Sequence, residues 1–383
     1  MFCYLIYGVI SPYLSILVRD LGYSALMVGV LLGIYEGAGI AGPFVFGYAA
    51  DRWGSYRGGI IATYLLSAAA AIPLTLFIHP AASAVFIALL AFSFRSGAPL
   101  LDAMTTVRLG QGGNYGKIRG AGSISFIVMV SFLQWTPFLR PNTAKNIGVW
   151  ITLTSLAAVV PALFLPRTGP RPRMAPHSAA GRTAFPPGAA SRRRGRFRLS
   201  GTFFGGFAII FLSRLAMAPV YTFFPLYLTE VLHWDAVGLM FALASVSEVP
   251  CMFIAARLLR RFGPLPLLAL SALGTVLRLG IYAFLPFKGA LLAAQFLHAL
   301  CFGLFHPAAV AFMTAAVPPE RRALGMSIYL SLGSGLPTLI GNVLGGAMVE
   351  HTGYTVLFAS FIAFAAAALI IYAVPRYTRG NHV

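Results

Sequence analysis

Apolar residues fall in twelve long blocks, and this spacing limits which folds the chain can adopt. Most blocks contain about 20 residues, the length of helix that crosses a hydrocarbon core about 30 Å thick. Segments this long are inconsistent with the alternating strands of a barrel. The sequence therefore predicts an all-α integral membrane protein with twelve transmembrane helices. They are expected near residues 2–18, 25–49, 58–78, 82–107, 119–137, 147–165, 202–228, 235–256, 265–286, 290–316, 324–349 and 354–374.

Arginine and lysine are distributed unevenly between alternate loops. The loops on the side of residues 166–200 contain 21 of them, against four on the other side. Cytoplasmic loops carry this excess in membrane proteins, so we expect both termini and the central segment in the cytoplasm and the protein in the inner (plasma) membrane. Because the net charge of +19 follows this loop distribution, nucleic acid is not an expected partner.

Residues 166–200 separate the blocks into two sets of six. This segment is rich in Pro, Gly, Ala and Arg and contains no acidic residue, which is typical of a flexible basic linker. The two sets repeat at an offset of 209 residues, which aligns Gly29 with Gly238 and Gly54 with Gly263. We expect two pseudo-symmetric six-helix bundles, 1–165 and 201–383, the second ending in a short cytoplasmic tail. The short first block favours a chain that begins late, without its natural N-terminal preamble.

The loop after the second block carries the motif G-x3-D-R-x-G-x-x-R, from Gly47 to Arg57. In this position, with twelve spans and a central loop, the chain resembles the major facilitator superfamily. The resemblance implies a gating loop that latches cytoplasmic helix ends, with Asp51, Arg52 and Gly54 as gating residues. Physical reasoning adds that Gly47 permits close helix approach, while Asp51 caps a helix N-terminus and pairs with a nearby arginine.

Shorter stretches resemble the phenylpropionate permease branch of that superfamily, a relative of the lactose and nucleoside proton symporters. The resemblance to lactose permease is looser and consists of an acid, an arginine and a histidine in spans 8, 9 and 10. Both resemblances imply a proton-coupled permease. The stretches are Pro99-Leu-Leu-Asp102-Ala, Tyr115-Gly116-Lys117-Ile-Arg119, Ser247-Glu248-Val, Leu297-His298 and Phe305-His306.

Ionisable residues stand near the middle of several apolar blocks. A charge at the centre of a spanning helix costs about 3 kcal/mol on insertion scales, so such residues must face one another or a wet cavity. Burial favours a protonated carboxyl and a neighbouring cation favours the carboxylate. We therefore predict that Glu248 binds the proton with Arg278 as its partner, unless the two form a static ion pair. His298 and His306, eight residues apart on one helix face, are expected to relay protons or bind solute.

Two further arginines, Arg95 and Arg214, are expected to bind an anionic substrate, because a guanidinium forks onto a carboxylate. The alternative is that they compensate embedded acids. Glu36 is either a titrating or substrate-binding acid or the fixed partner of Arg95, Arg214 or Arg278. Tyr221 is a candidate for stacking on a ring-bearing solute.

Asp102 lies about one turn from the cytoplasmic end of the fourth block. We expect it to form a gate salt bridge with Lys117 or Arg119, in preference to contacting solute. These three residues complete the predicted gating set.

The chain has no H-E-x-x-H motif, no Walker-type glycine loop and no spaced Cys/His ligand set. We expect neither an enzyme nor ATP-driven transport, and no metal or cofactor. The favoured function is a monomeric secondary transporter in the lipid bilayer, coupling protons to symport of a small organic solute by alternating access. The solute is an aromatic or other carboxylate, a sugar or a nucleoside. The alternatives are a proton-driven efflux antiporter for amphipathic compounds, a membrane-embedded enzyme with a histidine base, and a non-transporting receptor.

Overall fold

The computed structural model describes residues 1–109, 115–136, 143–166, 201–318 and 321–374, which are almost entirely helical and contain no strand. The first group of helices comprises α1 (Phe2–Asp20), α2 (Ala25–Trp53), α3 (Tyr56–Leu76), α4 (Pro80–Leu109), α5 (Tyr115–Trp135) and α6 (Ala144–Leu163). The second group comprises α7 (Gly201–Thr222), α8 (Phe224–Leu226), η3 (Tyr227–Val231), α9 (Val237–Phe262), α10 (Pro264–Phe284), α11 (Lys288–Phe296), η4 (Ala299–Leu304), α12 (Phe305–Ala316), α13 (Arg322–Ile328), η6 (Tyr329–Gly335), α14 (Leu336–Thr352) and α15 (Tyr354–Ala373).

These elements form the twelve helical columns that the sequence predicts. In the described ranges ten stretches are long and apolar enough to cross a membrane. Residues 237–262 qualify as a bent pair, and Ala121–Trp135 is a shorter apolar helix. The seventh, tenth and eleventh columns each contain a π-helical segment, η3, η4 and η6 respectively. Because π-bulges are rare and frequently occur at functional sites, these three columns of the second group are candidates for holding the functional site.

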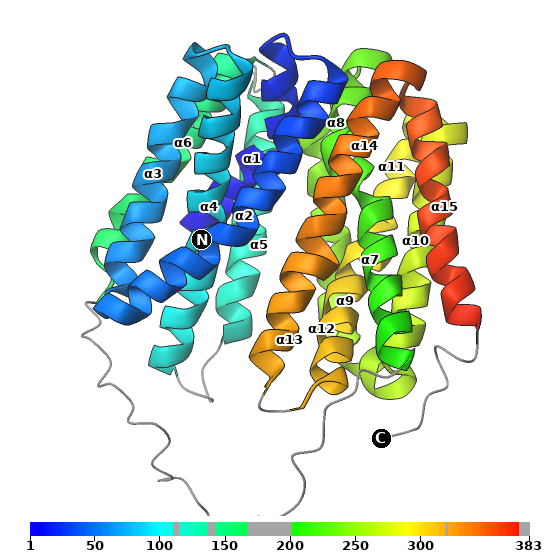
Figure 1. Cartoon of the computed structure of the whole chain (residues 1–383). Coiled ribbons are helices and arrows are strands. Elements are labelled where there is room, and N and C mark those ends of the chain that lie inside the picture. Colours follow the sequence, from blue (N-terminus) through cyan, green and yellow to red (C-terminus); the bar gives the residue numbers. More distant parts are fainter. Residues whose placement is uncertain (110–114, 137–142, 167–200, 319–320, 375–383) are drawn as a thin grey trace, which may run out of the picture.

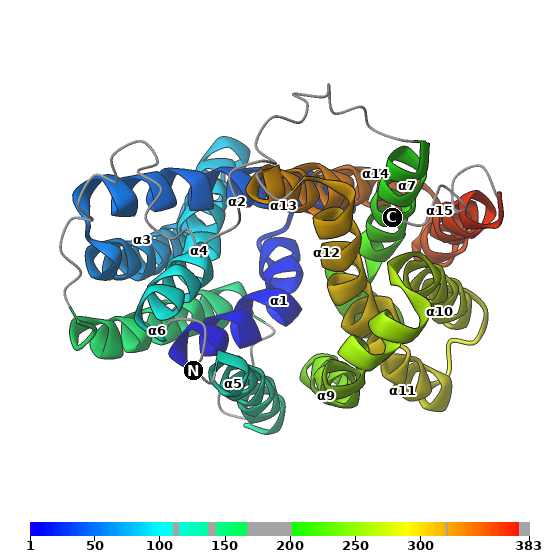
Figure 2. The same cartoon turned by 90° about the horizontal axis from the view of Figure 1, so that it is seen from below.

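The two groups stand side by side, with α1–α6 on one side and α7–α15 on the other (Figure 1). The view from below shows the same separation, with α1, α2 and α5 facing α9, α12 and α13 (Figure 2). We call the end of the molecule at which α6 finishes and α7 begins the linker end. The other end, where α1 finishes and α9 begins, is called the opposite end.

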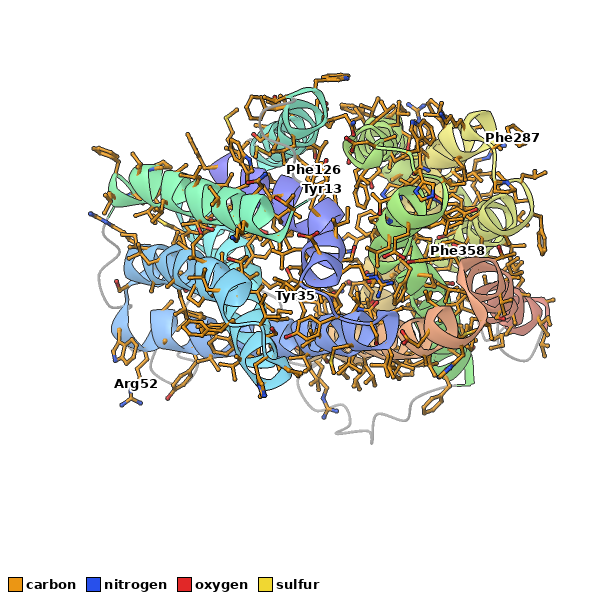
Figure 3. All side chains as sticks on the ribbon, turned by 90° about the horizontal axis from the view of Figure 1, so that it is seen from above. Tyr13, Tyr35, Arg52, Phe126, Phe287 and Phe358 are labelled. Carbon is orange, nitrogen blue, oxygen red and sulfur yellow. The ribbon has the colours of Figure 1, made fainter. Side chains whose placement is uncertain are left out.

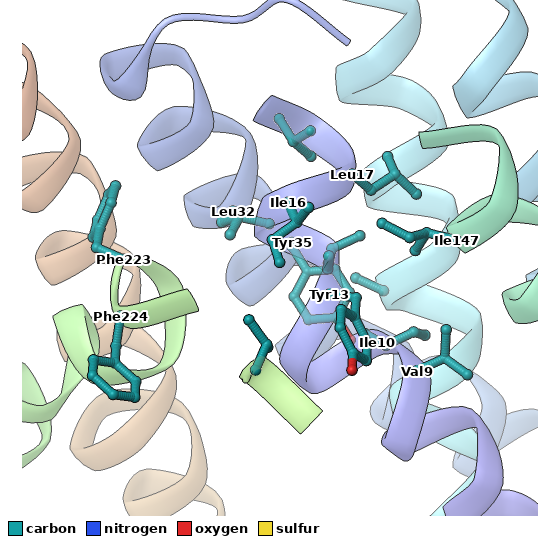
Figure 4. Close-up of a cluster of buried hydrophobic side chains, with 14 of the residues drawn as sticks. Val9, Ile10, Tyr13, Ile16, Leu17, Leu32, Tyr35, Ile147, Phe223 and Phe224 are labelled. Atoms are coloured by element: carbon teal, nitrogen blue, oxygen red, sulfur yellow. The ribbon is translucent and has the colours of Figure 1, made fainter. Parts of the chain in front are cut away.

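The largest buried apolar cluster contains residues of both groups, so the two halves share a core. Tyr13 and Leu17 of α1 and Ile147 of α6 belong to it, as does Phe224 from the other half (Figure 4). Phe358 lies fully buried among the second group, whereas Arg52 and Phe287 point away from the helices at the periphery (Figure 3). Apolar side chains outside the cluster are exposed in large numbers, as expected for surfaces that face lipid tails.

Glycines at repeat-related positions bring the two halves together. At Gly29 of α2, an added Cβ would overlap the carbonyl oxygen of Asn342 and lie 3.0 Å from Cα of Gly346, both on α14. At Gly238 of α9, it would lie 2.6 Å from the carbonyl oxygen of Val130 on α5. Small residues permit this close packing of membrane helices. The 209-residue offset therefore relates two equivalent helix crossings, α2 with α14 and α5 with α9.

Polar contacts between the halves gather at the opposite end. Nε of Arg19, at the end of α1, donates to Oε1 of Glu230 in η3 at 2.6 Å, and the Tyr354 hydroxyl donates to Oε2 of the same carboxylate at 2.7 Å. Gln134 of α5 donates to the carbonyl of Asp235 at 2.8 Å and accepts from the amide of Leu239 at 3.1 Å. These contacts hold the two halves together at the opposite end.

Candidate functional site

A line of hydrogen-bonded side chains crosses the middle of the second group. Glu248 of α9 accepts at Oε1 from Nε2 of His298, 2.6 Å away, and Nδ1 of His298 lies 2.8 Å from NH1 of Arg278 on α10. Arg278 and His298 are buried, while 22% of the Glu248 side chain is exposed. The sequence singled out these three residues, and the structure brings them together.

The expected direct partnership between Glu248 and Arg278 is wrong, because the His298 ring stands between them. Arg278 instead donates from NH2 to Oε1 of Gln295 at 2.6 Å and from Nε to the hydroxyl of Tyr282 at 2.8 Å. Among the described residues this guanidinium has only neutral acceptors. Its positive charge therefore has no carboxylate in direct contact.

Sequence reasoning missed Gln295 and Tyr282 as ligands of Arg278. Both are buried, and Nε2 of Gln295 also donates to the Tyr282 hydroxyl at 3.0 Å. A signal was present in the sequence. Gln295 is an amide in an apolar block one turn before His298, and Tyr282 lies one turn after Arg278, on the same helix face.

His298 and His306 lie on one face of the tenth column, as their spacing predicts, with Phe302 between them. The Phe302 ring stacks on His298 at a centroid distance of 5.5 Å and on His306 at 6.3 Å. The π-helical segment η4 lies between the two histidines. His306 contacts the hydroxyl of Tyr329 through Nδ1 at 2.9 Å and is not part of the line from Glu248 to Arg278. The structure thus separates the two histidines into different contacts.

Glu36 and Arg95 form an ion pair between α2 and α4. Of the partners that the sequence allowed for Glu36, the structure selects Arg95. The Arg95 guanidinium also lies 5.5 Å from the ring centroid of Tyr35, and a Cβ at Gly39 would overlap the Arg95 side chain. Glycine at position 39 therefore leaves the space in which Arg95 reaches the carboxylate.

Arg214 and Tyr221, seven residues or about two turns apart on α7, face the same region as His298. The Arg214 guanidinium lies 5.6 Å from the Tyr221 ring centroid. The Tyr221 ring in turn lies 6.3 Å from the His298 ring and 6.4 Å from Phe302. This arrangement connects Arg214, through one aromatic side chain, with the histidine that holds Glu248.

The motif from Gly47 to Arg57 forms the last turns of α2 and the start of α3, and its predicted roles need correction. Asp51 accepts a hydrogen bond from the Tyr56 hydroxyl and has no ion pair among the described residues. Ser55 caps α3 instead, since its hydroxyl accepts from the amide of Gly58 at 3.3 Å. An added Cβ at Gly47 would meet nothing within 4 Å, so no close helix approach requires that glycine. Gly54 ends α2 with φ of +61°, a conformation that favours glycine.

Gly263, at the repeat-related position, also has a positive φ, of +76°. Arg52 donates to the hydroxyl of Tyr48 at 3.2 Å, on the exposed surface of the same helix. The predicted salt bridge of Asp102 with Lys117 or Arg119 lies outside the described residues, because those two side chains are not described.

Twelve helical columns, two repeat-related halves and ionisable groups at mid-depth define a membrane transporter. The MFS_1 like family model matches residues 1–360, and the chain belongs to this family, within the major facilitator superfamily. It is 27% identical over 352 residues to the maltose permease of Geobacillus stearothermophilus, covering 90% of this chain and 84% of that one. It is 24% identical over 356 residues to a probable 3-phenylpropionic acid transporter of Escherichia coli (strain K12), covering 91% and 89% of the two chains.

Solved structures show the same fold. The nucleoside transporter NupG superposes with a TM-score of 0.76 at 18% identity, covering 97% of this chain and 95% of that one. The inward-open xylose transporter XylE from E. coli gives a TM-score of 0.69 at 14% identity, covering 97% and 94%. These likenesses confirm the predicted all-α architecture of twelve helices in two bundles.

Proposed function

We propose that the protein is a secondary transporter that couples protons to the symport of a small organic solute. The observation that carries this proposal is the Glu248–His298 hydrogen bond of 2.6 Å at the centre of the second half. A partly exposed carboxylate next to a histidine can take up a proton from water and is sensitive to any movement of that histidine. Glu248 is therefore the proposed proton site, and His298 and Arg278 hold it in place.

Alternating access is the proposed mode of movement. The halves 1–165 and 201–383, joined by 166–200, would rock about their shared apolar core. This proposal is supported by the contacts at the opposite end, where Arg19 holds Glu230 and Gln134 holds the first turn of α9. In the alternate conformation of the transport cycle, these contacts would break and the two halves would approach each other at the linker end.

The basic loops support an orientation with both termini and the linker end in the cytoplasm. In that orientation the Arg19–Glu230 and Gln134 contacts lie at the side away from the cytoplasm. One chain contains every residue of the proposed proton site, so we propose that a monomer is the functional unit.

Reconstituted proteoliposomes test the proposal. We expect a proton gradient directed inward to drive accumulation of a labelled solute, chosen from 3-phenylpropionate, maltose and uridine because relatives are named for solutes of these three kinds. Glu248→Gln should abolish accumulation but retain exchange of labelled for unlabelled solute. Accumulation that is the same with and without the gradient, and the same in Glu248→Gln as in the wild type, would refute proton coupling. Gradient-driven movement in the opposite direction to the protons would identify an efflux antiporter instead.

A further inference from the structure

Three arginines lie at mid-depth in the helices, and their surroundings differ. Arg95 is paired with Glu36, and Arg278 is surrounded by His298, Gln295 and Tyr282. Arg214 has no ion pair among the described residues. Its one side-chain hydrogen bond is a long contact of 3.5 Å from NH2 to the hydroxyl of Thr338. Since a charge within a membrane is costly without a counter-ion, Arg214 is the cation whose partner is missing.

Arg214 and its neighbour Tyr221 each have a buried polar atom without a partner. Nε of Arg214 is buried and has no hydrogen-bond partner, and the same holds for the hydroxyl of Tyr221, whose ring the guanidinium approaches. Unsatisfied buried donors of this kind are rare and costly in native proteins. A guanidinium and a phenol together present several N–H donors and one O–H donor, and they match the acceptor oxygens of a carboxylate.

The body of a ligand held at Arg214 would lie next to the aromatic column of Phe302. Tyr221 is edge-on to both His298 and Phe302, with interplanar angles of 76° and 75°. The phenyl ring of Phe302 and the imidazoles stacked on it provide an apolar and aromatic wall. This surface favours a ligand whose carboxylate carries a short apolar or aromatic body.

We propose that Arg214 and Tyr221 form the substrate subsite for a monocarboxylate, and that occupation of this subsite is coupled electrostatically to protonation of Glu248. This inference rests on the proposed transport function and names its substrate class. The charge distribution of the second half carries the coupling. Of the described titratable and charged groups, His298 contacts Glu248 directly, Arg278 of α10 and Tyr221 of α7 lie against that histidine, Arg214 lies against Tyr221, and Cys251 is one turn along α9.

Two of these groups are cations, Arg214 and Arg278, and Glu248 is the one carboxylate among these described groups. The empty site with Glu248 ionised therefore has one surplus positive charge. Protonation of Glu248 raises the surplus to two, which strengthens the attraction for a carboxylate. Binding of a carboxylate at Arg214 lowers the positive potential and so makes protonation of Glu248 easier. By linkage the two effects are equal, and proton and carboxylate bind cooperatively.

One proton and one monocarboxylate carry no net charge together. Transport by this mechanism is therefore electroneutral. It is driven by the difference in pH and by the solute gradient, and the membrane potential does not change its equilibrium.

Binding to purified full-length protein tests the subsite. The probes are benzoate, 3-phenylpropionate and 4-phenylbutyrate, each compared with its primary amide, which has the same shape without the charge. We expect at least one carboxylate to bind and its amide to bind at least about thirtyfold more weakly, the factor that corresponds to the smaller losses seen when a buried charge pair is broken. Arg214→Gln should abolish the preference for the acid, whereas Arg214→Lys and Tyr221→Phe should reduce it in part. Arg261→Gln, at an exposed arginine of α9, is the control.

The results decide between the alternatives. Equal affinity for acid and amide, no binding of any of the three carboxylates, or an unchanged preference in a folded Arg214→Gln protein would each overturn the subsite. Folding of each variant is checked by its thermal unfolding and its elution in size-exclusion chromatography. If Arg214→Gln does not fold, the partial loss expected for Tyr221→Phe, which keeps the ring and removes only the hydroxyl, remains the test. An unchanged preference in that variant would then overturn the subsite.

The pH dependence of carboxylate affinity tests the coupling between Arg214 and Glu248. We expect the carboxylate to bind about tenfold more tightly at acid than at neutral pH, within the usual range of coupling between two sites. Glu248→Gln, a permanently neutral side chain, should bind tightly at both pH values. A pH-independent affinity in the wild-type protein would overturn the coupling. Proteoliposomes separate this inference from the general function: proton-driven uptake of maltose or uridine that survives Arg214→Gln would refute the carboxylate subsite and leave symport intact. Binding that prefers the acid to its amide, without proton-driven uptake, would support the carboxylate subsite and refute symport.

Discussion

Nδ1 of His298 lies 2.8 Å from NH1 of Arg278, and this contact assigns the proton on the imidazole ring. A guanidinium only donates hydrogen bonds, so Nδ1 must accept and carries no proton. The ring proton is then on Nε2, where it is donated to Glu248. In this arrangement the imidazole is neutral, with Nδ1 accepting from Arg278 and Nε2 donating to Glu248. His298 is thus assigned as a positioning group for Glu248.

This assignment predicts how His298 variants behave. In His298→Gln an amide still offers one donor to Glu248 and one acceptor to Arg278, so proton-driven uptake should fall by less than about tenfold. His298→Ala removes both contacts and should lower uptake by about tenfold to a hundredfold, the range typical of groups that orient a functional ligand. Uptake measured against external pH is the readout. A pH midpoint that stays in place in His298→Gln supports Glu248 as the proton site, and loss of all pH dependence in that variant would show that the imidazole carries the proton.

Arg278 should be important for stability as well as for function. Replacing it by methionine leaves Gln295, Tyr282 and His298 without its donors, and each of these side chains is buried. We expect a loss of about 3 kcal/mol in the free energy of unfolding, because buried polar partners left unsatisfied are costly. Denaturant unfolding in detergent measures it. The exposed arginine variant Arg261→Gln is the control and should unfold like the wild type, whereas equal stability of Arg278→Met would show that the network contributes nothing.

Several features of the site could be predicted from the sequence alone. The helical columns follow from block length, because a bilayer admits few other structures. The grouping of Glu248, Arg278 and His298 follows from the cost of embedded charge. The order of contacts within the group could not be predicted, because it depends on helix rotation and on the neutral ligands Gln295 and Tyr282. An apolar block with one amide does not indicate which charge that amide contacts.

The sequence repeat predicted which positions of the two halves are structurally equivalent. The 209-residue offset was read from a loop motif, and in the structure it relates the helix crossings at Gly29 and Gly238 and the positive φ angles of Gly54 and Gly263. The motif's proposed contacts were less predictable. Asp51 and Gly47 make neither the helix cap nor the close approach expected of them. The glycine of this short motif has a positive φ in both copies, whereas the side-chain partners depend on the conformation of the whole chain.

Replacing Glu36 and Arg95 together should cost less stability than the sum of the two single replacements. Either single neutral variant, Glu36→Gln or Arg95→Gln, leaves an unpaired charge at mid-depth and should destabilise the protein by about 2 kcal/mol, a value reduced because both side chains are partly exposed. The double variant should recover much of that loss. A double-mutant cycle in thermal unfolding checks this expectation. Strictly additive losses would indicate that the two side chains do not interact, and Arg95 would then become a second candidate for anion binding.

The glycines at the crossings of the halves should control which end is open. A methyl group at Gly29 or Gly238 overlaps backbone atoms of the other half, and overpacking of this kind costs about 1–3 kcal/mol. Gly29→Ala and Gly238→Ala should therefore shift the protein towards the conformation that is open at the opposite end. Gly47→Ala is the matched control, since the added methyl meets nothing within 4 Å. Spin labels attached to cysteines at exposed positions His79 and His351, in a background without native cysteines, report the change as a longer distance. Identical distances in all three variants would contradict this role.

The ion pair between Arg19 and Glu230 should act as a latch at the opposite end. Its side chains are 37% and 30% exposed, so solvent screening limits its contribution to about 1 kcal/mol or less. Arg19→Gln should consequently increase the population open at the opposite end by at most about fivefold, and Tyr354→Phe, which removes the second hydrogen bond to the same carboxylate, should have a smaller effect. The same pair of spin labels measures both. The charge-exchanged double variant, Arg19→Glu with Glu230→Arg, should restore the wild-type distances, because attraction between the two ends is retained when their signs are reversed. A double variant that stays as open as Arg19→Gln would contradict a latch role for the attraction between these two charges.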